Sequence, residues 1–303
     1  MTALAPRVVA LGGGHGLATT LTGLVGRAAD LTAVVSVADD GGSSGRLRRE
    51  LGIIAPGDMR RCLEALAPPG LLIDAVAHRF SDGEMAGHVA GNILLAALLE
   101  HASDPAAAAD ALGELLGARG RVLPATLGAV DLLADTEIGV VRGQVRVGRS
   151  SGVERVRWDP AEPEVPPDVL VAIGAADLIV LGPGSLYTSV LASVVPAIGR
   201  AIASARGRVV YVANLAPQPA ETDGYHLADH IAAVLRHGVD PDVVLADADS
   251  PDLGDHPDVT VVRARVTGAS PRHHDPERLG RALCGLTARV GERGSRASAP
   301  GGA

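Results

Sequence analysis

The stretch Arg7–Gly16 reads RVVALGGGHG and decides the fold. Its first half is a short apolar run, typical of a buried strand, and Leu17–Val25 beyond it carries apolar residues at helical spacing. Four glycines stand in the five residues Gly12–Gly16 between that strand and that helix. A strand, a glycine-rich turn and a helix in this order begin a βαβ unit, so the stretch predicts a Rossmann-like sheet.

Short apolar runs and amphipathic stretches alternate along the rest of the chain. Strands are predicted at Leu31–Val37, Leu178–Leu181, Arg208–Val212, Val243–Ala246 and Val259–Arg263. Helices are predicted at Arg46–Leu51 after an irregular glycine-rich loop, Met59–Ala67 with Asp58 as N-cap, Leu71–Arg79, Asn92–His101, Pro105–Leu116 with Asp104 as N-cap, Asp223–His237 and Asp275–Val290. The alternation predicts an α/β fold with a mostly parallel sheet and right-handed crossovers.

The pattern changes after Arg121. Val140–Val147 and Val153–Trp158 alternate apolar and polar residues, which predicts antiparallel strands, and the proline-rich stretch Pro160–Pro167 closes this segment. We therefore expect one domain over residues 1–290, with a small antiparallel insertion at about 138–160. Residues 291–303 are rich in Gly, Ser, Ala and Arg and are expected to be a disordered tail.

The composition excludes several classes of function. The formal net charge is −8, so no overall positive stripe for a nucleic acid is expected, although five arginines cluster between Arg46 and Arg61. Aromatic residues make up 2%, too few for the stacking platforms of a single-strand binder. Cys62 and Cys284 match neither a zinc pattern nor a disulfide framework. Neither a membrane span nor a secretory leader is recognisable, so a cytoplasmic protein is expected.

The loop Gly12-Gly13-Gly14-His15-Gly16 is the first candidate binding site. Glycine lets a ligand approach the main chain, and the helix that follows directs N–H groups and the positive end of its dipole at phosphate oxygens. An ordinary turn is the alternative, but one or two glycines would suffice for it. Leu17 occupies the third glycine position of a dinucleotide fingerprint, and no P-loop Lys follows, so hydride transfer is not implied.

A second polar loop follows the next predicted strand. Asp39 and Asp40 stand where Rossmann folds place a ribose-binding carboxylate. Ser43, Ser44 and Arg46 offer hydroxyl and guanidinium donors, and we expect Arg46 to grip two phosphate oxygens. The alternatives are a simple Asp-Gly turn and a Mg²⁺ site on the two aspartates.

A third loop follows the strand Leu178–Leu181 and reads GPGSLYTS. Its Gly182, Gly184, Ser185 and Thr188 form another candidate phosphate loop where a helix should start. A nucleophilic Ser there would need a His base, and sequence alone does not decide whether one lies beside it. Because the carboxyl ends of parallel strands share one edge of a sheet, we expect the three loops to converge on one crevice.

Other polar residues have a structural alternative beside the functional one. Asn92 is either a ligand contact or the N-cap of its apolar helix. The pair His273-His274 resembles a metal pair in composition, but adjacent side chains point apart, which favours a solvated turn with Asp275 as N-cap. Four residues after another strand end suit either a base or sugar, or the capping of a helix at Asp223: Asn214, Gln218, Glu221 and Thr222.

At these residues the chain resembles the YvcK type of the CofD-like superfamily, also called the gluconeogenesis-factor family. The similar segments are VVALGGGHGL, TAVVSVADDGGSSGRLRRELG, APGDMRR, GHVAGNILLAAL, GRVLPATL, ADLIVLGPGSLYTSV and ANLAPQPAETDGYHLADH, with a weaker likeness in RHHDPERL. They run from Arg7 to about His237 and so cover most of the chain. Two departures stand out: His15 replaces the family's commonest Thr, and Asp247–His256 is shorter and lacks a tyrosine.

The resemblance implies a CofD-like fold that binds a UDP-sugar, notably UDP-N-acetylglucosamine, with no required cofactor. It implies a cytoplasmic regulator of carbon metabolism, gluconeogenic growth and cell-wall precursor supply that affects cell shape, in a family without established catalytic turnover. Mg²⁺ binding, a homodimer and protein partners in cell-wall synthesis stay open. The alternative is an enzyme like 2-phospho-L-lactate transferase, but that branch carries Glu-Asp-Thr and aromatic residues where this chain reads ADDGGSSGRLR.

Overall fold

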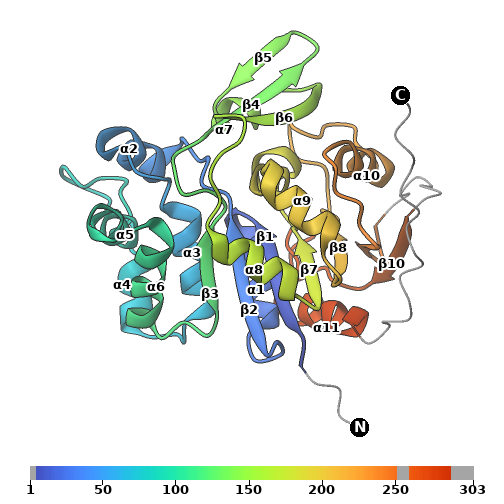
Figure 1. Cartoon of the computed structure of the whole chain (residues 1–303), viewed down its shortest axis with the longest axis horizontal. Coiled ribbons are helices and arrows are strands. Elements are labelled where there is room, and N and C mark those ends of the chain that lie inside the picture. Colours follow the sequence, from blue (N-terminus) through green and yellow to red (C-terminus); the bar gives the residue numbers. More distant parts are fainter. Residues whose placement is uncertain (1–4, 251–258, 288–303) are drawn as a thin grey trace.

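The computed structural model describes residues 5–250 and 259–287 and confirms the α/β prediction. A seven-stranded sheet has the order β10-β9-β8-β7-β1-β2-β3, and every neighbouring pair is parallel (Figure 1). Its strands are β1 (Arg7–Gly12), β2 (Asp30–Val35), β3 (Arg121–Pro124), β7 (Leu178–Leu181), β8 (Arg208–Val212), β9 (Val243–Asp247) and β10 (Thr260–Ala264). The sequence does not predict β3, which is short and ends in a proline.

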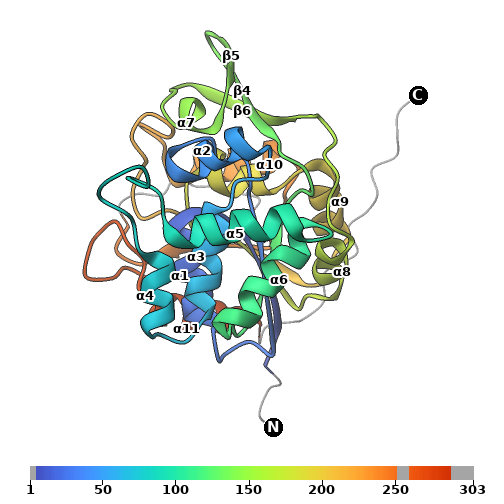
Figure 2. The ribbon, with the colours of Figure 1, turned by 90° about the vertical axis from the view of Figure 1, so that its left-hand side faces the viewer.

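Alternate strand residues pack against two layers of helices. Val8 and Ala10 of β1 belong to one apolar cluster, whereas Val9 and Leu11 belong to the other. The first cluster includes residues of α1 (Gly14–Leu24), α3 (Gly57–Leu66), α4 (Leu71–Ala77), α5 (Ala90–His101), α6 (Pro105–Leu116) and α11 (Pro276–Thr287). The second includes residues of α8 (Pro167–Ala175), α9 (Pro196–Ser204) and α10 (Leu227–Arg236). Figure 2 shows α5 and α6 beside α3 at the β3 end of the sheet.

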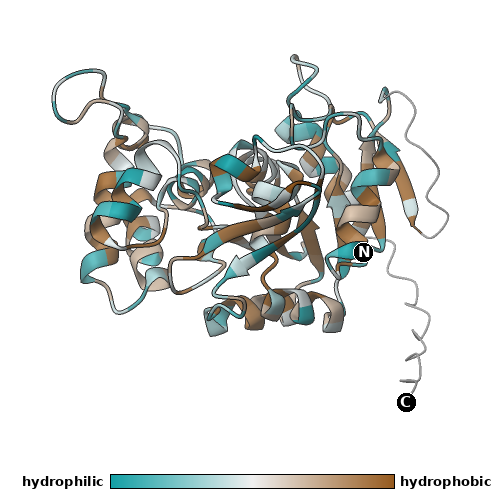
Figure 3. Ribbon diagram, turned by 90° about the horizontal axis from the view of Figure 1, so that it is seen from above, coloured by the Kyte–Doolittle hydropathy of each residue, from teal (hydrophilic) through white to brown (hydrophobic). Residues whose placement is uncertain are grey.

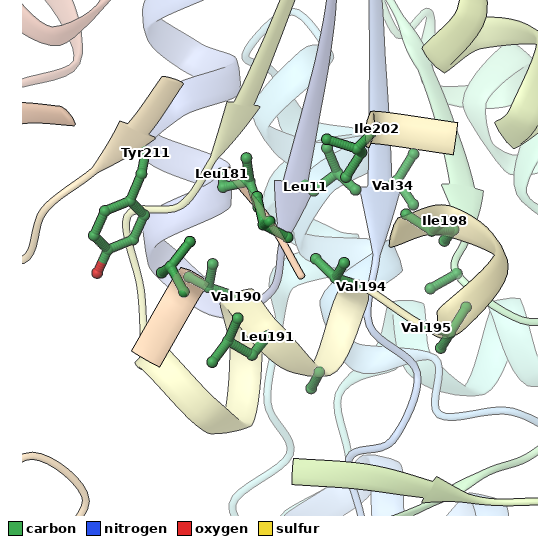
Figure 4. Packing of buried hydrophobic residues seen from close by; sticks show 14 of the residues in the cluster. Leu11, Val34, Leu181, Val190, Leu191, Val194, Val195, Ile198, Ile202 and Tyr211 are labelled. Atoms are coloured by element: carbon green, nitrogen blue, oxygen red, sulfur yellow. The ribbon is translucent and has the colours of Figure 1, made fainter. Parts of the chain in front are cut away.

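The second layer is tightly filled beneath the centre of the sheet. In Figure 4, Leu11 and Leu181 of neighbouring strands lie above Val190 and Val194, and Ile198 lies to one side of them. Leu11, Leu181 and Ile198 are all 0% exposed, so truncating one of the leucines to Ala costs about 2–5 kcal/mol. Neither α8 nor α9 is predicted from the sequence; both are short and begin at a proline.

The antiparallel insertion is confirmed, but its predicted start and one of its strands are wrong. It contains β4 (Asp131–Thr136), β5 (Gly139–Arg142), α7 (Gln144–Val147) and β6 (Val153–Asp159), and its strand order is β5-β4-β6. The insertion therefore begins near Asp131, and the predicted strand Val140–Val147 is half helix. Gly143 has a φ of 100°, which ends the strand and turns the chain into α7. The insertion stands above the middle of the sheet in Figure 1 and at the top of the molecule in Figure 2.

Apolar residues concentrate inside the domain. Figure 3 shows the central strands mostly in brown and the outer faces of many helices in teal. Among the described residues, no single helix is long and apolar enough to cross a membrane; the bent pair Leu186–Ser193 and Pro196–Ser204 passes by length and composition alone. The predicted tail, residues 291–303, and the predicted end of the last helix lie outside the described residues.

Candidate functional site

The crevice lies between the ends of β1 and β7, which are neighbours at the centre of the sheet. From β1 the sheet continues through β2 and β3, and from β7 it continues the other way through β8, β9 and β10. Ligands of open α/β sheets bind where the strand order reverses in this way. A cavity of about 410 Å³ lies there. Its wall is formed mainly by Gly13–Gly16, Pro183–Ser185, Asn214–Pro219 and Arg272–His274.

The first loop leads directly into α1, which begins at Gly14 instead of near Leu17, so Gly12 ends β1, Gly13 is the N-cap, and Gly14 and Gly16 lie in the first turn. Gly14 has a φ of 62°, and a Cβ built on it would meet nothing within 4 Å. A Cβ on Gly13 would lie 2.6 Å from Asp58 Oδ2, and one on Gly16 would collide with the Pro183 carbonyl. The left-handed backbone conformation therefore favours glycine at position 14, whereas close packing requires glycine at positions 13 and 16. First-turn N–H groups lack partners within their helix, which suits this cavity to an anion.

Asp58 lies beside this loop in a position different from the predicted one. It is not an N-cap, because α3 begins at Gly57 with Pro56 before it. Its Oδ2 accepts a hydrogen bond from the Gly14 N–H at 2.7 Å, and its Oδ1 accepts one from Arg61 at 2.6 Å. The positive charge of Arg61, followed by burial, lowers the pKa of His15. The His15 ring, which lines the cavity, is therefore uncharged at neutral pH.

Two side chains shape the loop after β7. Buried Glu221 accepts hydrogen bonds from the N–H groups of Tyr187 and Thr188, at 2.9 and 2.8 Å, and from the Thr188 hydroxyl at 3.1 Å. Burial raises the pKa of Glu221. Asn214 donates to the Gly184 carbonyl at 2.8 Å and accepts from the Gly184 N–H at 3.1 Å. Glu221 and Thr188 thus bond to each other, whereas Asn214, Gly184 and Ser185 belong to the cavity wall.

The segment after β8 continues the wall. Gln218 lines the cavity, and its N–H donates to the buried hydroxyl of Thr222 at 2.8 Å. The predicted helix start at Asp223 is wrong, because α10 begins at Leu227. His226 caps it: the His226 N–H donates to Asp229 at 2.8 Å in a reciprocal capping box. The polar residues between β8 and α10 therefore lie in the connecting segment before the helix.

The second predicted loop is largely a helix. α2 spans Gly42–Leu51, so the irregular loop predicted up to Gly45 is wrong. A Cβ on Gly45 would collide with the Asp40 carbonyl, so this glycine allows a tight helical start. Asp39 Oδ1 accepts from the Gly41 N–H at 2.9 Å, and Asp40 Oδ1 accepts from the Val145 N–H of α7 at 2.9 Å. Both aspartates lie outside the walls of the cavity between β1 and β7.

Ser43 of α2 and Asn92 of α5 belong to a buried polar network. Asn92 donates to Ser43 Oγ at 3.2 Å and accepts from Arg60 Nε at 2.8 Å, and Arg60 also pairs with Glu64 at 2.6 Å. Asn92 is not the N-cap of α5, because that helix begins at Ala90. The network connects α2, α3 and α5 outside the wall of the cavity.

Two other residues of the second loop are also placed by internal contacts. Arg46 donates to the Ala86 carbonyl at 3.1 Å, and a Cβ on Gly57 would collide with the Ser44 hydroxyl. The structure therefore brings together the loops after β1, β7 and β8, and leaves Arg46 and Ser44 apart from that wall. Asp104 is an N-cap as predicted, since it accepts from Ala106 and Ala107.

Arg272, His273 and His274 complete the wall, although the sequence predicts a solvated turn there. Asp275 does cap α11 as predicted, accepting from the Arg278 N–H at 2.8 Å. Burial lowers the pKa of His274 to about 4, and its buried Nε2 has no hydrogen-bond partner among the described residues.

The crossing of α1 and α11 explains why residues 272–274 reach the first loop. A Cβ on Gly23 would collide with the Pro276 carbonyl, and one on Gly280 with the Gly23 carbonyl, so the two backbones touch. This contact brings the segment before α11 beside α1. Glycines at helical positions are a signal of close helix packing, but the sequence does not say which helix approaches.

Comparison with known proteins gives consistent results. The family described as "2-phospho-L-lactate transferase CofD" matches residues 8–288. The "Gluconeogenesis factor" of Bacillus subtilis is 43% identical over 237 residues, which cover 77% of this chain and 75% of that protein. A longer relative from Deinococcus radiodurans is 48% identical over 246 residues, and the matched part spans 53% of its length and 79% of this chain.

A solved structure extends the similarity to the fold. The crystal structure of a UPF0052-family protein from Bacillus halodurans superposes with a TM-score of 0.88 at 36% sequence identity. The match covers 92% of this chain and 99% of that one. The parallel sheet with its antiparallel insertion is therefore shared with that protein.

Proposed function

Because the chain belongs to the CofD family and to its gluconeogenesis-factor group, we propose that it binds UDP-N-acetylglucosamine in the cavity between β1 and β7. The observation that carries the proposal is the first turn of α1, whose glycines line that cavity at the switch point of the sheet. The diphosphate would bind to the N–H groups of this turn.

The wall supplies further partners for such a ligand. Arg272 is a guanidinium at the cavity and suits the second phosphate group. Asn214, Gln218 and Ser185 are polar groups that suit the sugar hydroxyls. Of the residues assigned from the sequence, we propose that those in the wall contact the ligand: Gly13, Gly14, His15, Gly16, Gly184, Ser185, Asn214 and Gln218. We assign Asp39, Asp40, Ser43, Thr188, Glu221 and Thr222 to holding the surrounding loops.

We propose a regulatory role for this binding. The name of the Bacillus subtilis relative supports a part in carbon metabolism, and the ligand is a precursor of the cell wall. The bound state would link carbon metabolism with cell-wall synthesis and cell shape, in the cytoplasm. Mg²⁺ would assist only by screening the diphosphate.

A thermal-shift and calorimetry panel tests the proposal. UDP-N-acetylglucosamine, UDP, GDP and NAD are compared, each with and without Mg²⁺. A ligand at a hundred times its dissociation constant should stabilise the native state by roughly 2.7 kcal/mol. We expect the UDP compounds to bind and GDP to bind at least about tenfold more weakly, a difference of roughly 1.4 kcal/mol. Tight binding of GDP or NAD without UDP would overturn the proposal.

The name of the matching family supplies a second candidate, a 2-phospho-L-lactate transferase. Such an enzyme would move a phospholactyl group from a guanosine diphosphate carrier to a deazaflavin. An assay with these two substrates decides between the candidates. Transfer that depends on this protein would establish the enzyme; the regulator proposal expects none.

A further inference from the structure

A second cavity, of about 350 Å³, shares a wall with the first. The segment Asn214–Pro217 lines both, so the two spaces adjoin along one stretch of chain after β8. The rest of the second wall comes from Gly224–Leu227 and His230 around the start of α10, and from Ser250 after β9. Open space therefore extends from the switch point toward β8 and β9.

The opposite direction, toward β2, is occupied by protein contacts. Rossmann folds commonly place a ribose-binding carboxylate after the second strand. Here the carboxylates of Asp39 and Asp40 accept hydrogen bonds from the main-chain N–H groups of Gly41 and Val145. Neither aspartate lines either cavity. A nucleotide anchored at α1 thus has room on the β8 side.

One of the chain's three tyrosines and two of its ten histidines line the second cavity. The sequence contains three tyrosines, one phenylalanine and one tryptophan. Tyr225, His226 and His230 all line this cavity, and the ring centroids of Tyr225 and His230 are 5.5 Å apart with their planes at 86°. Ring faces and edges of this kind bind flat heteroaromatic groups.

Two polar atoms of these rings are already engaged. The Tyr225 hydroxyl is hydrogen-bonded to the Tyr187 hydroxyl at 3.0 Å, and His230 Nδ1 to the Tyr211 hydroxyl at 3.2 Å. Burial lowers the pKa of His230 to about 4, so its ring is neutral. A sugar ring needs many hydrogen-bond partners, which suits the first cavity better; a base can stack with few.

We propose that the second cavity binds the uracil ring, so that the nucleotide runs from the first turn of α1 across Asn214–Pro217 toward β9. This inference rests on the proposed function, in which the ligand is a UDP-sugar. The sugar then stays in the first cavity with the diphosphate, beside Gln218 and Arg272.

Ser250→Trp tests the proposal, because Ser250 lines the second cavity and not the first. The matched control is Ala248→Trp, an exposed position nearby that lines neither cavity. Calorimetry compares UDP-N-acetylglucosamine, UDP and inorganic pyrophosphate. We expect Ser250→Trp to weaken both uridine ligands at least about tenfold and pyrophosphate less than about twofold, and Ala248→Trp to weaken none.

Other patterns overturn the proposal. Unchanged UDP binding in Ser250→Trp places the base elsewhere, and loss of UDP-N-acetylglucosamine alone places the sugar in the second cavity. If the unchanged protein binds no uridine ligand, the proposed function itself fails, which is a separate result.

Photocrosslinking with 4-thio-UDP needs no variant and so is independent of folding effects. The thiocarbonyl group marks the base, and mass spectrometry of the digested protein locates the attachment. We expect attachment within residues 213–230. Attachment within residues 36–49, after β2, would overturn the proposal.

Discussion

The carboxylate of Asp58 accepts a hydrogen bond from the Gly14 N–H at 2.7 Å and so fastens the first turn of α1 to α3. The same carboxylate pairs with Arg61 at 2.6 Å, which offsets its negative charge beside the anion site. The candidate phosphate loop is therefore held in place from outside by a helix that lies beyond β2 in the chain.

Removing this carboxylate should destabilise the protein. Because a charge-assisted hydrogen bond contributes about 1.5–3 kcal/mol, Asp58→Ala should lower the free energy of unfolding by that amount. Asp58→Asn keeps an acceptor for the Gly14 N–H and should lose less than half as much. Urea unfolding measures both variants. Equal losses would show that the contact to Gly14 contributes nothing.

Gly14→Ala should weaken the ligand, because the added Cβ would project into open space at the cavity. Gly26→Ala is the matched control: Gly26 also has a positive φ, of 76°, and open space around it, but it lies outside the cavity. Both variants should lose roughly 1–2 kcal/mol of stability through left-handed strain. Calorimetry with UDP should show at least about a tenfold loss for Gly14→Ala alone. A similar loss in both variants would point to strain as the cause.

Variants of two arginines distinguish a phosphate site at the cavity wall from one at the second loop. Arg272→Ala should weaken UDP by about ten- to a hundredfold, because it removes a charge-assisted contact of about 1.5–3 kcal/mol. Arg46→Ala should change the affinity by less than about twofold, since Arg46 donates to the Ala86 carbonyl outside the wall. Uridine, which lacks phosphates, should bind both variants like the unchanged protein. A large loss of UDP affinity in Arg46→Ala with little loss in Arg272→Ala would place the diphosphate over α2.

Local patterns in the sequence predict the elements that carry a strong signal. The glycine loop between β1 and α1, the strand Leu178–Leu181 and the cap Asp104 all follow from short-range rules. The sequence does not predict the short strands β3 and β4, because four to six residues with interspersed polar or proline positions carry little periodicity. The sequence does not predict the start of α2, because Gly42–Gly45 is typical of a loop and only close packing makes these small residues helical.

The candidate site likewise has a part that the sequence predicts and a part that depends on long-range packing. The sequence predicts that the loops after β1 and β7 meet, because the carboxyl ends of parallel strands share one edge of a sheet. The approach of Arg272–His274 could not, since it depends on the contact of Gly23 with Gly280 across the domain. Likewise, Glu221 and Asn92 look like ligand residues from composition, yet their polar atoms bond to Thr188 and to Arg60.

Acid should destabilise the fold through its buried histidines. Burial lowers the pKa of His230 to about 4, below the ordinary value of 6.5. The fold therefore favours the neutral ring, so this stabilisation is fully present above pH 6.5 and is lost as the pH falls toward 4. Urea unfolding should show a smaller loss between pH 7 and pH 5 in His230→Gln than in the unchanged protein. An identical pH dependence would mean that His230 does not titrate differently in the folded state.

A crystal structure of the protein with UDP-N-acetylglucosamine tests directly whether the ligand binds between β1 and β7. We predict that the diphosphate lies within hydrogen-bonding distance of the main-chain N–H groups of His15 and Gly16, beside Arg272. A ligand bound over α2 at Asp39–Arg46, or a saturated crystal with no ligand between β1 and β7, would contradict it.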